Sequence, residues 1–247
     1  YSARAAGAGG RGGGRFDDRS CWRRLEMSAS ILSLASASTR RKELLERAGF
    51  SVRVIGAPVD ETPFPGELPI DYTKRLARSK VLSAVRRLEA THQFSAEEEA
   101  PTRAYFQPTR AEEPTRWVLG ADTTVAIDDV LLGKPNDVQE AREMLLRLGG
   151  REHFVYTGFS LFDLKREKEG LQAVATQVRM KPLSRSEIDK YLSLGESMDK
   201  AGSYAIQGVG AYMVQEIRGS YTNVVGLPLC QVIEMMQEMG ATDVLPF

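Results

Sequence analysis

The chain has few of the residues that build metal centres and disulfide frameworks. It contains two cysteines, Cys21 and Cys230, and two histidines, His92 and His153. Cysteines so far apart match neither a metal-binding spacing nor a disulfide framework, which favours a reducing compartment. Two histidines leave little room for a histidine-based metal site. We therefore expect a cytoplasmic protein whose chemistry does not depend on cysteine or histidine clusters.

The sequence also lacks a long apolar run and an excess of charge of one sign. No apolar stretch approaches the roughly 20 residues that cross a bilayer. The 33 basic and 33 acidic residues give a formal net charge of zero, so no overall field attracts nucleic acid or an anionic membrane. Neither is expected as a partner. The 247 residues are 42% hydrophobic and 27% charged, as in ordinary globular proteins of one domain or two small ones.

Two segments differ from the rest in composition. In residues 1–27, six of the first fourteen residues are glycine, and six arginines accompany three acids. Such a segment cannot bury enough apolar surface to fold alone, so we expect a disordered leader before a domain over 28–247. The Arg-rich leader also fits an organelle transit peptide, the alternative to a cytoplasmic location. Residues 91–116 are acidic, contain three prolines and predict a flexible insertion.

Strands and helices alternate along the remaining sequence. Apolar or alternating runs predict strands at 31–36, 51–56, 117–121, 124–127, 154–162 and 171–180, the last two paired as a hairpin. Helical spacing and end signals predict helices at about 39–48, 71–90, 137–148, 184–194 and 229–240. Capping pairs are expected at Asp137 with Glu140 and at Ser184 with Glu187. This order indicates an α/β protein with a mixed sheet.

The stretch 119–137 combines an acid and a lysine that suit a phosphorylated substrate. Asp122 follows a short apolar strand, and Lys134 follows twelve residues later between a glycine and a proline. The acid can deprotonate water or hold a divalent metal, and the lysine can neutralise phosphate charge. The alternative is a structural strand, a hairpin turn at Asp128–Asp129, a second strand and a surface loop. The spacing alone leaves both interpretations open.

A second candidate site is the serine-rich turn that leads into the helix near residue 39. Arg40 and Arg41 stand at the start of this helix, where free N–H groups and guanidinium groups together form an anion site. Positive charge there opposes the helix dipole. Such a local conflict favours a functional role.

Three further positions have a structural and a functional interpretation each. Lys80 lies on the inward-facing line of the helix at 71–90, so it either extends to solvent or serves a site. Asp60 and Glu61 follow a strand, where they form either a metal site or a solvated turn. Gln207 lies in a glycine-rich segment, 198–208, and its amide can both donate to and accept from the edge of a base.

Together and in this order, these segments resemble the Maf family of nucleotide pyrophosphatases. The likeness runs from Ile31 to about Glu238, and the matching motifs are LASASTRRKELL, VDE, RLARSK, LGADT, GKP, MDKAGSYAIQG and GSYTNVVGLPL. The resemblance implies hydrolysis of nucleoside triphosphates to the monophosphate and pyrophosphate, with Mg or Mn as cofactor. It also implies a twisted mixed sheet flanked by helices, two lobes with a central cleft, and a homodimer.

The resemblance further implies a role for individual residues. Asp122 matches the proton acceptor and, with Glu61, the acids near the metal. The groups expected around the triphosphate are Ser36, Arg40, Arg41, Lys80 and Lys134. Thr39 departs from the family pattern, which usually has proline before the arginines; a threonine can cap the helix instead.

Base preference in the family follows three positions, which fall on Arg40, Thr123 and Gln207. The Arg, Thr, Gln combination is similar to the branch that acts on dTTP and UTP. Two alternatives stay open: a nucleotide-binding regulator of cell division without catalysis, and a pyrophosphatase of the 7-methyl-GTP or inosine-triphosphate type. The presence of Asp122 and Glu61 together with the lysines argues against the first, and Gln207 against the second.

Overall fold

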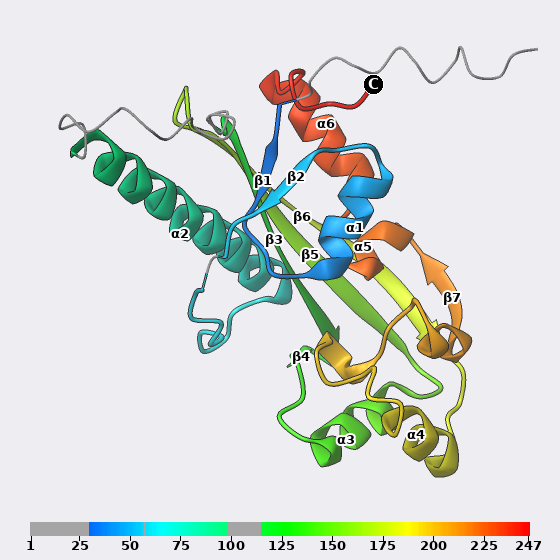
Figure 1. Ribbon diagram of the computed structural model, residues 1–247. Helices are drawn as coiled ribbons and strands as arrows, with labels where there is room; N and C mark the ends of the chain where they lie inside the picture. The colour runs from blue at the N-terminus through cyan, green and yellow to red at the C-terminus, as the bar shows by residue number, and fades with distance from the viewer. Residues whose placement is uncertain (1–29, 57, 98–114) are drawn as a thin grey trace, which may run out of the picture.

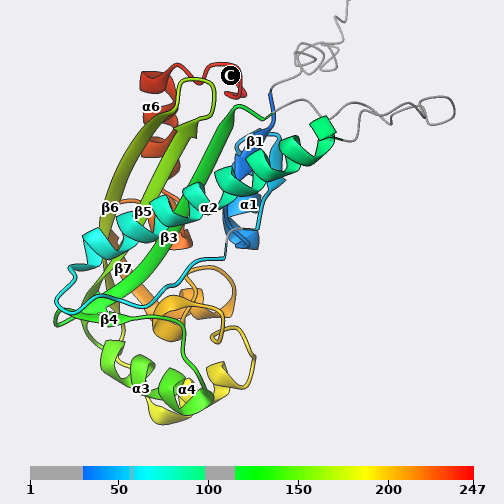
Figure 2. The ribbon, with the colours of Figure 1, turned by 90° about the vertical axis from the view of Figure 1, so that its left-hand side faces the viewer.

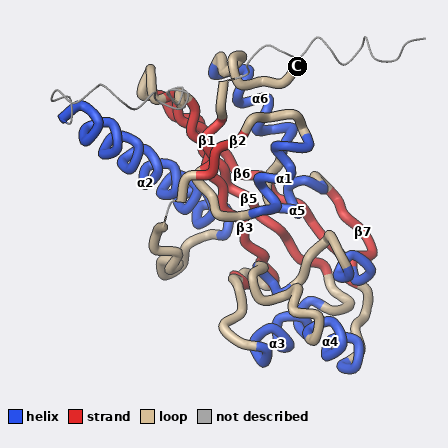
Figure 3. Tube along the Cα trace, in the orientation of Figure 1, coloured by secondary structure: helices blue, strands red, loops and turns tan. Residues whose placement is uncertain are grey.

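The computed structural model describes residues 30–56, 58–97 and 115–247. The expected leader and most of the expected insertion lie outside these residues. In the described part, a seven-stranded mixed sheet in the order β2-β1-β3-β5-β6-β7, with β4 paired to β3, carries helices on both faces (Figures 1 and 3). The expected α/β class with a mixed sheet is confirmed. No helix in the described ranges is both long and apolar enough to cross a bilayer.

Strands and helices alternate along the described residues. The strands are β1 (Leu32–Leu34), β2 (Val52–Val54), β3 (Trp117–Ile127), β4 (Val130–Leu132), β5 (Glu152–Asp163), β6 (Lys168–Met180) and β7 (Val214–Arg218). The helices are α1 (Thr39–Arg47), α2 (Pro69–Glu97), α3 (Val138–Leu148), α4 (Arg185–Leu192), α5 (Tyr221–Val225) and α6 (Leu229–Met239), with 3-10 turns η1 (Ala201–Ser203) and η2 (Val209–Met213).

Most expected elements are present, and two expectations are corrected. The strands expected at 117–121 and 124–127 form one strand, because the residues between them keep their pairing with β5. The prediction of a loop over 91–116 is wrong at its start, because α2 continues to Glu97. Residues 91–97 contain no glycine or proline that would end a helix. The β5–β6 hairpin is confirmed, with pairing up to Asp163 and Lys168.

The turns and helix ends follow the local sequence signals closely. Asp128 and Asp129 both have positive φ, 52° and 60°, and connect β3 to β4 in the expected hairpin turn. The capping box of Ser184 and Glu187 is complete. The second capping pair is half formed: the Asp137 side chain accepts from the Glu140 N–H, but the Glu140 carboxylate accepts from the N–H of Asn136 instead of Asp137.

Helix α2 lies across one face of the central strands (Figure 2). Glycines in β3 and β5 permit this close approach. A Cβ atom on Gly158 would lie 2.4 Å from the backbone of Thr73, and one on Gly120 would lie 2.7 Å from the carbonyl oxygen of Ala77. Any side chain at these positions would therefore push the helix away. The approach brings Lys80, one turn further along, close to the next residues of β3.

The described residues form three apolar cores: a small one packs α2 against Val118, and the other two lie at the two ends of the long strands. One packs α1 and α6 against the sheet around Leu45, Trp117 and Met236. The other packs α3 and α4 around Leu145 and Tyr191. The molecule therefore has two lobes that share β3, β5 and β6, with α1 and α6 at one end and α3 and α4 at the other (Figure 1).

One edge of β3 is left uncovered between the two lobes. Strand β1 pairs with this edge at Val118 and Leu119, and β4 pairs with it only from Val125 onwards. Asp122 and Thr123 lie in the gap. Because successive side chains of a strand point to opposite faces, Asp122 faces α2 and Thr123 faces α1, where each finds its partner.

Candidate active site

A cleft opens at the uncovered edge of β3 and has two adjoining parts. The part beside α1 is lined by residues 36–40 together with Lys80, and the part beside η1 is lined by residues 204–207 and 224–226. Both parts share the four charged residues Arg40, Glu61, Lys134 and Asp199. The structure thus brings together residues that are more than 160 positions apart in sequence.

A lysine between two carboxylates forms the centre of the cleft. The Lys80 ammonium lies 2.5 Å from Asp122 Oδ1 and 2.7 Å from Glu61 Oε1. Lys80 and Asp122 are buried, whereas the Glu61 side chain is 46% exposed. Lys80 therefore does not extend to solvent, and its ammonium pairs with two carboxylates at the cleft. Asp60, by contrast, is exposed and accepts from the N–H of Thr62, as expected for a solvated turn.

The two carboxylates on Lys80 have opposite pKa shifts. Burial raises the pKa of Asp122, and the positive charges of Lys80 and Arg41 offset only part of this effect. Partial burial also acts to raise the pKa of Glu61, but the hydrogen bond and the charge of Lys80 outweigh it and leave the pKa lowered. Two carboxyl groups with divergent proton affinity in one cleft are typical of acid–base chemistry.

A divalent metal fits this pair in one specific way. Among the described residues, no group of three or more His, Cys, Asp or Glu is placed to hold a metal ion. Mg²⁺ is commonly held by one or two carboxylates together with substrate phosphates and water. Glu61 and Asp122, both in contact with one ammonium, suit a metal that is bound jointly by the protein and a phosphorylated ligand.

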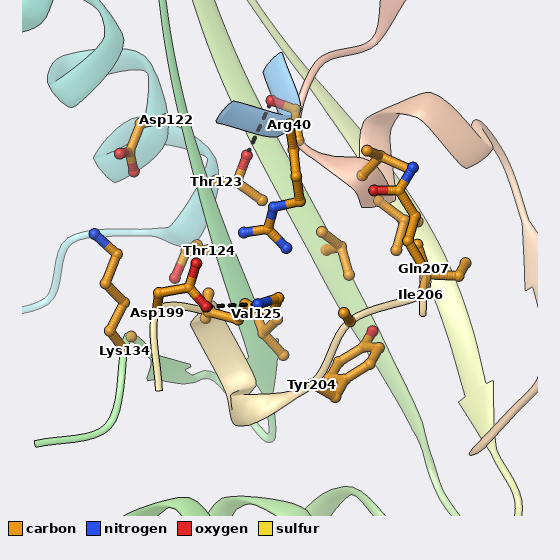
Figure 4. A pocket seen from close by; sticks show the side chains of 18 of the residues that line it. Arg40, Asp122, Thr123, Thr124, Val125, Lys134, Asp199, Tyr204, Ile206 and Gln207 are labelled. Carbon is orange, nitrogen blue, oxygen red and sulfur yellow. Dashed lines mark hydrogen bonds and ion pairs between the residues drawn. The ribbon is translucent and has the colours of Figure 1, made fainter. Parts of the chain in front are cut away.

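The two arginines at the start of α1 point in different directions. Arg40 lines both parts of the cleft, and Figure 4 shows its side chain extending across the middle, between Asp122 and Gln207. Arg41 is 8% exposed and is absent from the lining of both parts. Arg40 is therefore directly available to a ligand in the cleft, whereas Arg41 lies behind the wall.

Arg41 holds together three segments of that wall. Its Nε donates to the carbonyl oxygen of Gly226 at 2.7 Å, its Nη1 to Ser36 Oγ at 2.9 Å and its Nη2 to Thr123 Oγ1 at 2.9 Å. Burial lowers the pKa of the Arg41 guanidinium. With these donors bonded to protein oxygens, Arg41 fixes the turn before α1, strand β3 and the turn after α5 relative to one another.

The start of α1 leaves backbone donors at the cleft. Thr39, which was expected to cap this helix, is its first helical residue; Ser38 occupies the N-cap position, and its side chain makes no capping hydrogen bond, so the expected cap is wrong. Residues 36–39 line the cleft. Uncapped N–H groups and the Arg40 guanidinium next to them suit an anion. Ser36 Oγ, which was expected to contact substrate, accepts from Arg41 and from the N–H of Ser38.

The part of the cleft beside η1, called the apolar part below, adds apolar side chains and an amide to the charged residues that both parts share. Its walls include Val125, Val155 and Val224, and Gln207 lies at the end away from Asp122 (Figure 4). Lys134 extends toward Asp122 at the opposite end (Figure 4). The cleft therefore combines charged groups near Asp122 with apolar side chains and one donor–acceptor group, Gln207, at the other end.

Several lining residues were not identified from the sequence. Tyr72, Tyr204 and the valines of the apolar part all line the cleft. Tyr204 lies within the MDKAGSYAIQG motif, so that motif was a usable signal. Val224 likewise lies within the GSYTNVVGLPL motif. Val155 had no such signal, because valines at buried strand positions occur throughout the core.

Comparisons with known proteins agree with the geometry. The family described as Maf-like protein matches residues 31–239. A dTTP/UTP pyrophosphatase of Citrifermentans bemidjiense is 44% identical over 215 residues, which cover 87% of this chain and 98% of that protein. A dTTP/UTP pyrophosphatase of Geobacter sulfurreducens is 44% identical over 217 residues, 87% of this chain and 100% of that protein. One of the same name from Myxococcus xanthus is 43% identical over 211 residues, 85% of this chain and 93% of that protein.

Proposed function

Because the chain belongs to the Maf-like protein family, we propose that it is a nucleoside triphosphate pyrophosphatase that hydrolyses dTTP and UTP. The products are the nucleoside monophosphate and pyrophosphate. The observation that carries this proposal is the placement of Lys80, Asp122 and Glu61 in contact, within a cleft that also holds Arg40 and Lys134.

The charged end of the cleft suits the triphosphate. Arg40 and Lys134 can neutralise the negative charge of the phosphates, and the free N–H groups at the start of α1 can donate to phosphate oxygens. Phosphoryl transfer depends mainly on such positioning and charge stabilisation. Arg41 contributes indirectly in this proposal, by holding Ser36 and Thr123 in place.

Asp122 is the proposed proton acceptor. Its raised pKa makes the carboxylate a better base than a solvated aspartate. As water adds to phosphorus, its proton passes to Asp122, the bridging bond between the α- and β-phosphates breaks, and pyrophosphate leaves. The Lys80 ammonium lies between the two acids and balances the charge that develops.

A divalent cation, Mg²⁺ or Mn²⁺, is the proposed cofactor. Glu61 and Asp122 would hold it together with the phosphates. A bound divalent cation supplies charge neutralisation and orientation of the phosphate oxygens. The protein's share is to keep the two carboxylates at one point of the cleft, which Lys80 does by contacting both.

The apolar end of the cleft is the proposed base site. Thymine and uracil present an N3–H donor between two carbonyl acceptors, and the Gln207 amide can complement this edge. Cytosine has an amino group at position 4 and no N3–H, so in the amide orientation that fits thymine and uracil donors would face donors. Each mispaired buried polar group costs about 1–3 kcal/mol, or about 5- to 150-fold in kcat/KM.

A nucleotide panel tests this function. Purified protein is incubated with dTTP, UTP, CTP, 7-methyl-GTP or ITP and Mg²⁺ or Mn²⁺, and pyrophosphate and orthophosphate are measured separately. We expect dTTP and UTP to be hydrolysed well above CTP, with release of pyrophosphate. A preference for 7-methyl-GTP or ITP would indicate another branch, and binding without hydrolysis would indicate a non-catalytic regulator.

A further inference from the structure

Two buried tyrosine hydroxyl groups, those of Tyr204 and Tyr191, hold the loop that carries Gln207. The Tyr204 hydroxyl lies 2.7 Å from Nε2 of His153 on β5. The N–H of Ala205 donates to the hydroxyl of Tyr191 on α4 at 3.2 Å. These contacts connect residues 204 and 205 to two different elements of the lobe built around α3 and α4, directly before the amide at the cleft edge.

His153 is an unusual residue for the place it occupies. It is 1% exposed, and burial lowers its pKa to about 4, so the imidazole is neutral at neutral pH. Its ring meets that of Tyr204 edge-on, with centroids 5.4 Å apart. Among the described residues, the other ring nitrogen has no hydrogen-bond partner. The Tyr204 hydroxyl is thus the polar contact of this buried imidazole. An apolar side chain at this position would have a lower free-energy cost of burial.

Tyr204 transmits its position to the cleft. Its ring lines the apolar part beside Ile206 and Gln207 (Figure 4). The segment around it has little freedom to shift: a Cβ on Gly202 would lie 3.0 Å from the Val125 side chain, and one on Gly210 would lie 2.6 Å from the carbonyl oxygen of Ala205. A change at the Tyr204 hydroxyl therefore has to be absorbed by the adjacent residues up to Gln207.

We propose that His153 is a positioning residue for base selection: by bonding the Tyr204 hydroxyl, it fixes where Gln207 meets the base. This inference rests on the proposed pyrophosphatase function. His153 lies outside the lining of the cleft and acts through Tyr204. The charged end of the cleft is built from other elements. Loss of the His153–Tyr204 hydrogen bond should therefore affect binding and choice of base more than the chemical step.

Three variants test the proposal: Tyr204→Phe, which removes only the hydroxyl, His153→Leu, which removes the partner, and His153→Gln, which keeps a hydrogen-bonding side chain. We measure kcat and KM for dTTP and CTP, and the affinity for dTMP by calorimetry. Tyr204→Phe and His153→Leu should reduce the dTTP-to-CTP ratio of kcat/KM and weaken dTMP binding, each by about threefold to tenfold, the cost of one buried hydrogen bond. The effect falls mainly on KM, and His153→Gln should recover part of the ratio.

Val178→Ala is the matched control. Val178 is buried in the same core and pairs with His153 in the sheet, so its truncation lowers the melting temperature without removing either partner of the His153–Tyr204 hydrogen bond. It should leave the dTTP-to-CTP ratio unchanged. A ratio that stays at the wild-type value in Tyr204→Phe, or falls equally in Val178→Ala, overturns the proposal. A wild-type protein that does not prefer dTTP to CTP instead overturns the proposed function itself, and the inference with it.

Discussion

Neighbouring residues of this chain have different roles because their side chains point in different directions and contact different elements. Asp122 and Thr123 adjoin in β3, yet Asp122 contacts Lys80 of α2 and Thr123 contacts Arg41 of α1. Arg40 and Arg41 separate in the same way at the start of α1, one into the cleft and one behind it. Substitutions at adjacent positions should therefore have separable effects.

Asp122→Asn should abolish turnover and leave the fold intact. The amide keeps the shape of the side chain but cannot accept the proton, and loss of a general base costs about 10²- to 10⁴-fold in rate. The measurement is kcat with dTTP, together with the melting temperature. Asp60→Asn, at an exposed turn of the same cleft region, is the control and should keep wild-type kcat. If Asp122→Asn turns over like wild type, the base lies elsewhere, with Glu61 the next candidate.

The two arginines allow a paired test. Arg41→Lys should destabilise the fold by about 3 kcal/mol, because a lysine cannot make the three bonds to Gly226, Ser36 and Thr123 from a buried position. Arg40→Lys should leave stability nearly unchanged and raise KM for dTTP. Chemical denaturation and steady-state kinetics distinguish the two. Equal increases in KM with unchanged stability would mean that Arg41 contacts the triphosphate directly.

This pair also marks how far the sequence could predict the site. The ordered motifs identified Asp122, Glu61, Lys80, Lys134, Arg40 and Gln207, which the structure brings to one cleft. The motifs could not separate Arg40 from Arg41, because adjacent helix residues differ by about 100° in direction and only the packed neighbours decide which one faces the ligand. Val155 in β5 lies in none of these motifs, and only its packed neighbours show that it faces the cleft.

At the level of elements, the loop before α2 is held in place by the helix that follows it. Arg75 donates to both carboxylate oxygens of Glu67, at 2.6 and 2.7 Å, and stacks 4.0 Å above the Phe64 ring. The Tyr72 hydroxyl donates to the carbonyl oxygen of Glu61 at 2.8 Å. Since this loop is largely exposed, these contacts and the Lys80 pair determine where Glu61 lies.

Arg75→Lys should therefore slow catalysis more than it harms stability. A lysine loses the two parallel bonds to Glu67 and the flat stacking on Phe64. Displacement of Glu61 by a fraction of an ångström to about 1 Å should lower kcat with dTTP by about tenfold or more. Arg78→Lys is the control, because Arg78 lies in the same helix and pairs with Glu169 at the surface. Equal kcat values for the two variants would show that the loop does not depend on Arg75.

Prediction of the elements was limited by contacts that are distant in sequence. Periodicity located the helices and strands, and Ser184 with Glu187 fixed a helix start. The merging of two strands into β3 depends on the pairing of Asp122 with Gly158 and of Thr123 with Thr157, which no local pattern contains. The close approach of α2 depends on Gly120 and Gly158, whose purpose appears only when the helix is placed above them.

For the whole molecule, the cleft lies where two separately packed cores meet on shared strands. The core around Trp117 and the core around Tyr191 each hold one side of the cleft. Two buried ionisable groups, Asp122 in the cleft and His153 beside the core around Tyr191, connect the stability of the whole fold to pH. Their pKa shifts change the stability of the fold in opposite directions as pH falls. A comparison between variants is therefore needed to separate the two contributions.

The pH dependence of unfolding should show how much neutral His153 contributes to the free energy of unfolding. Burial lowers its pKa from 6.5 to about 4, so on acidification the unfolded chain binds the proton first. The stability that neutral His153 provides is complete above about pH 6.5 and is lost progressively as pH falls to about 4. The loss is about 3 kcal/mol for a shift of this size. Raising the pKa of Asp122 has the opposite effect, because the folded protein then binds its proton more readily.

The measurement is the free energy of unfolding of wild type and of His153→Gln between pH 7 and pH 4. Glutamine does not titrate in this range, and Asp122 is present in both proteins, so its contribution largely cancels in the difference. Relative to His153→Gln, the wild type should lose about 3 kcal/mol over this range, and most of the loss should fall between pH 6.5 and 4. Parallel curves for the two proteins would mean that the folded state accepts a proton on His153 as readily as the unfolded chain. The imidazole would then not be held neutral against Tyr204.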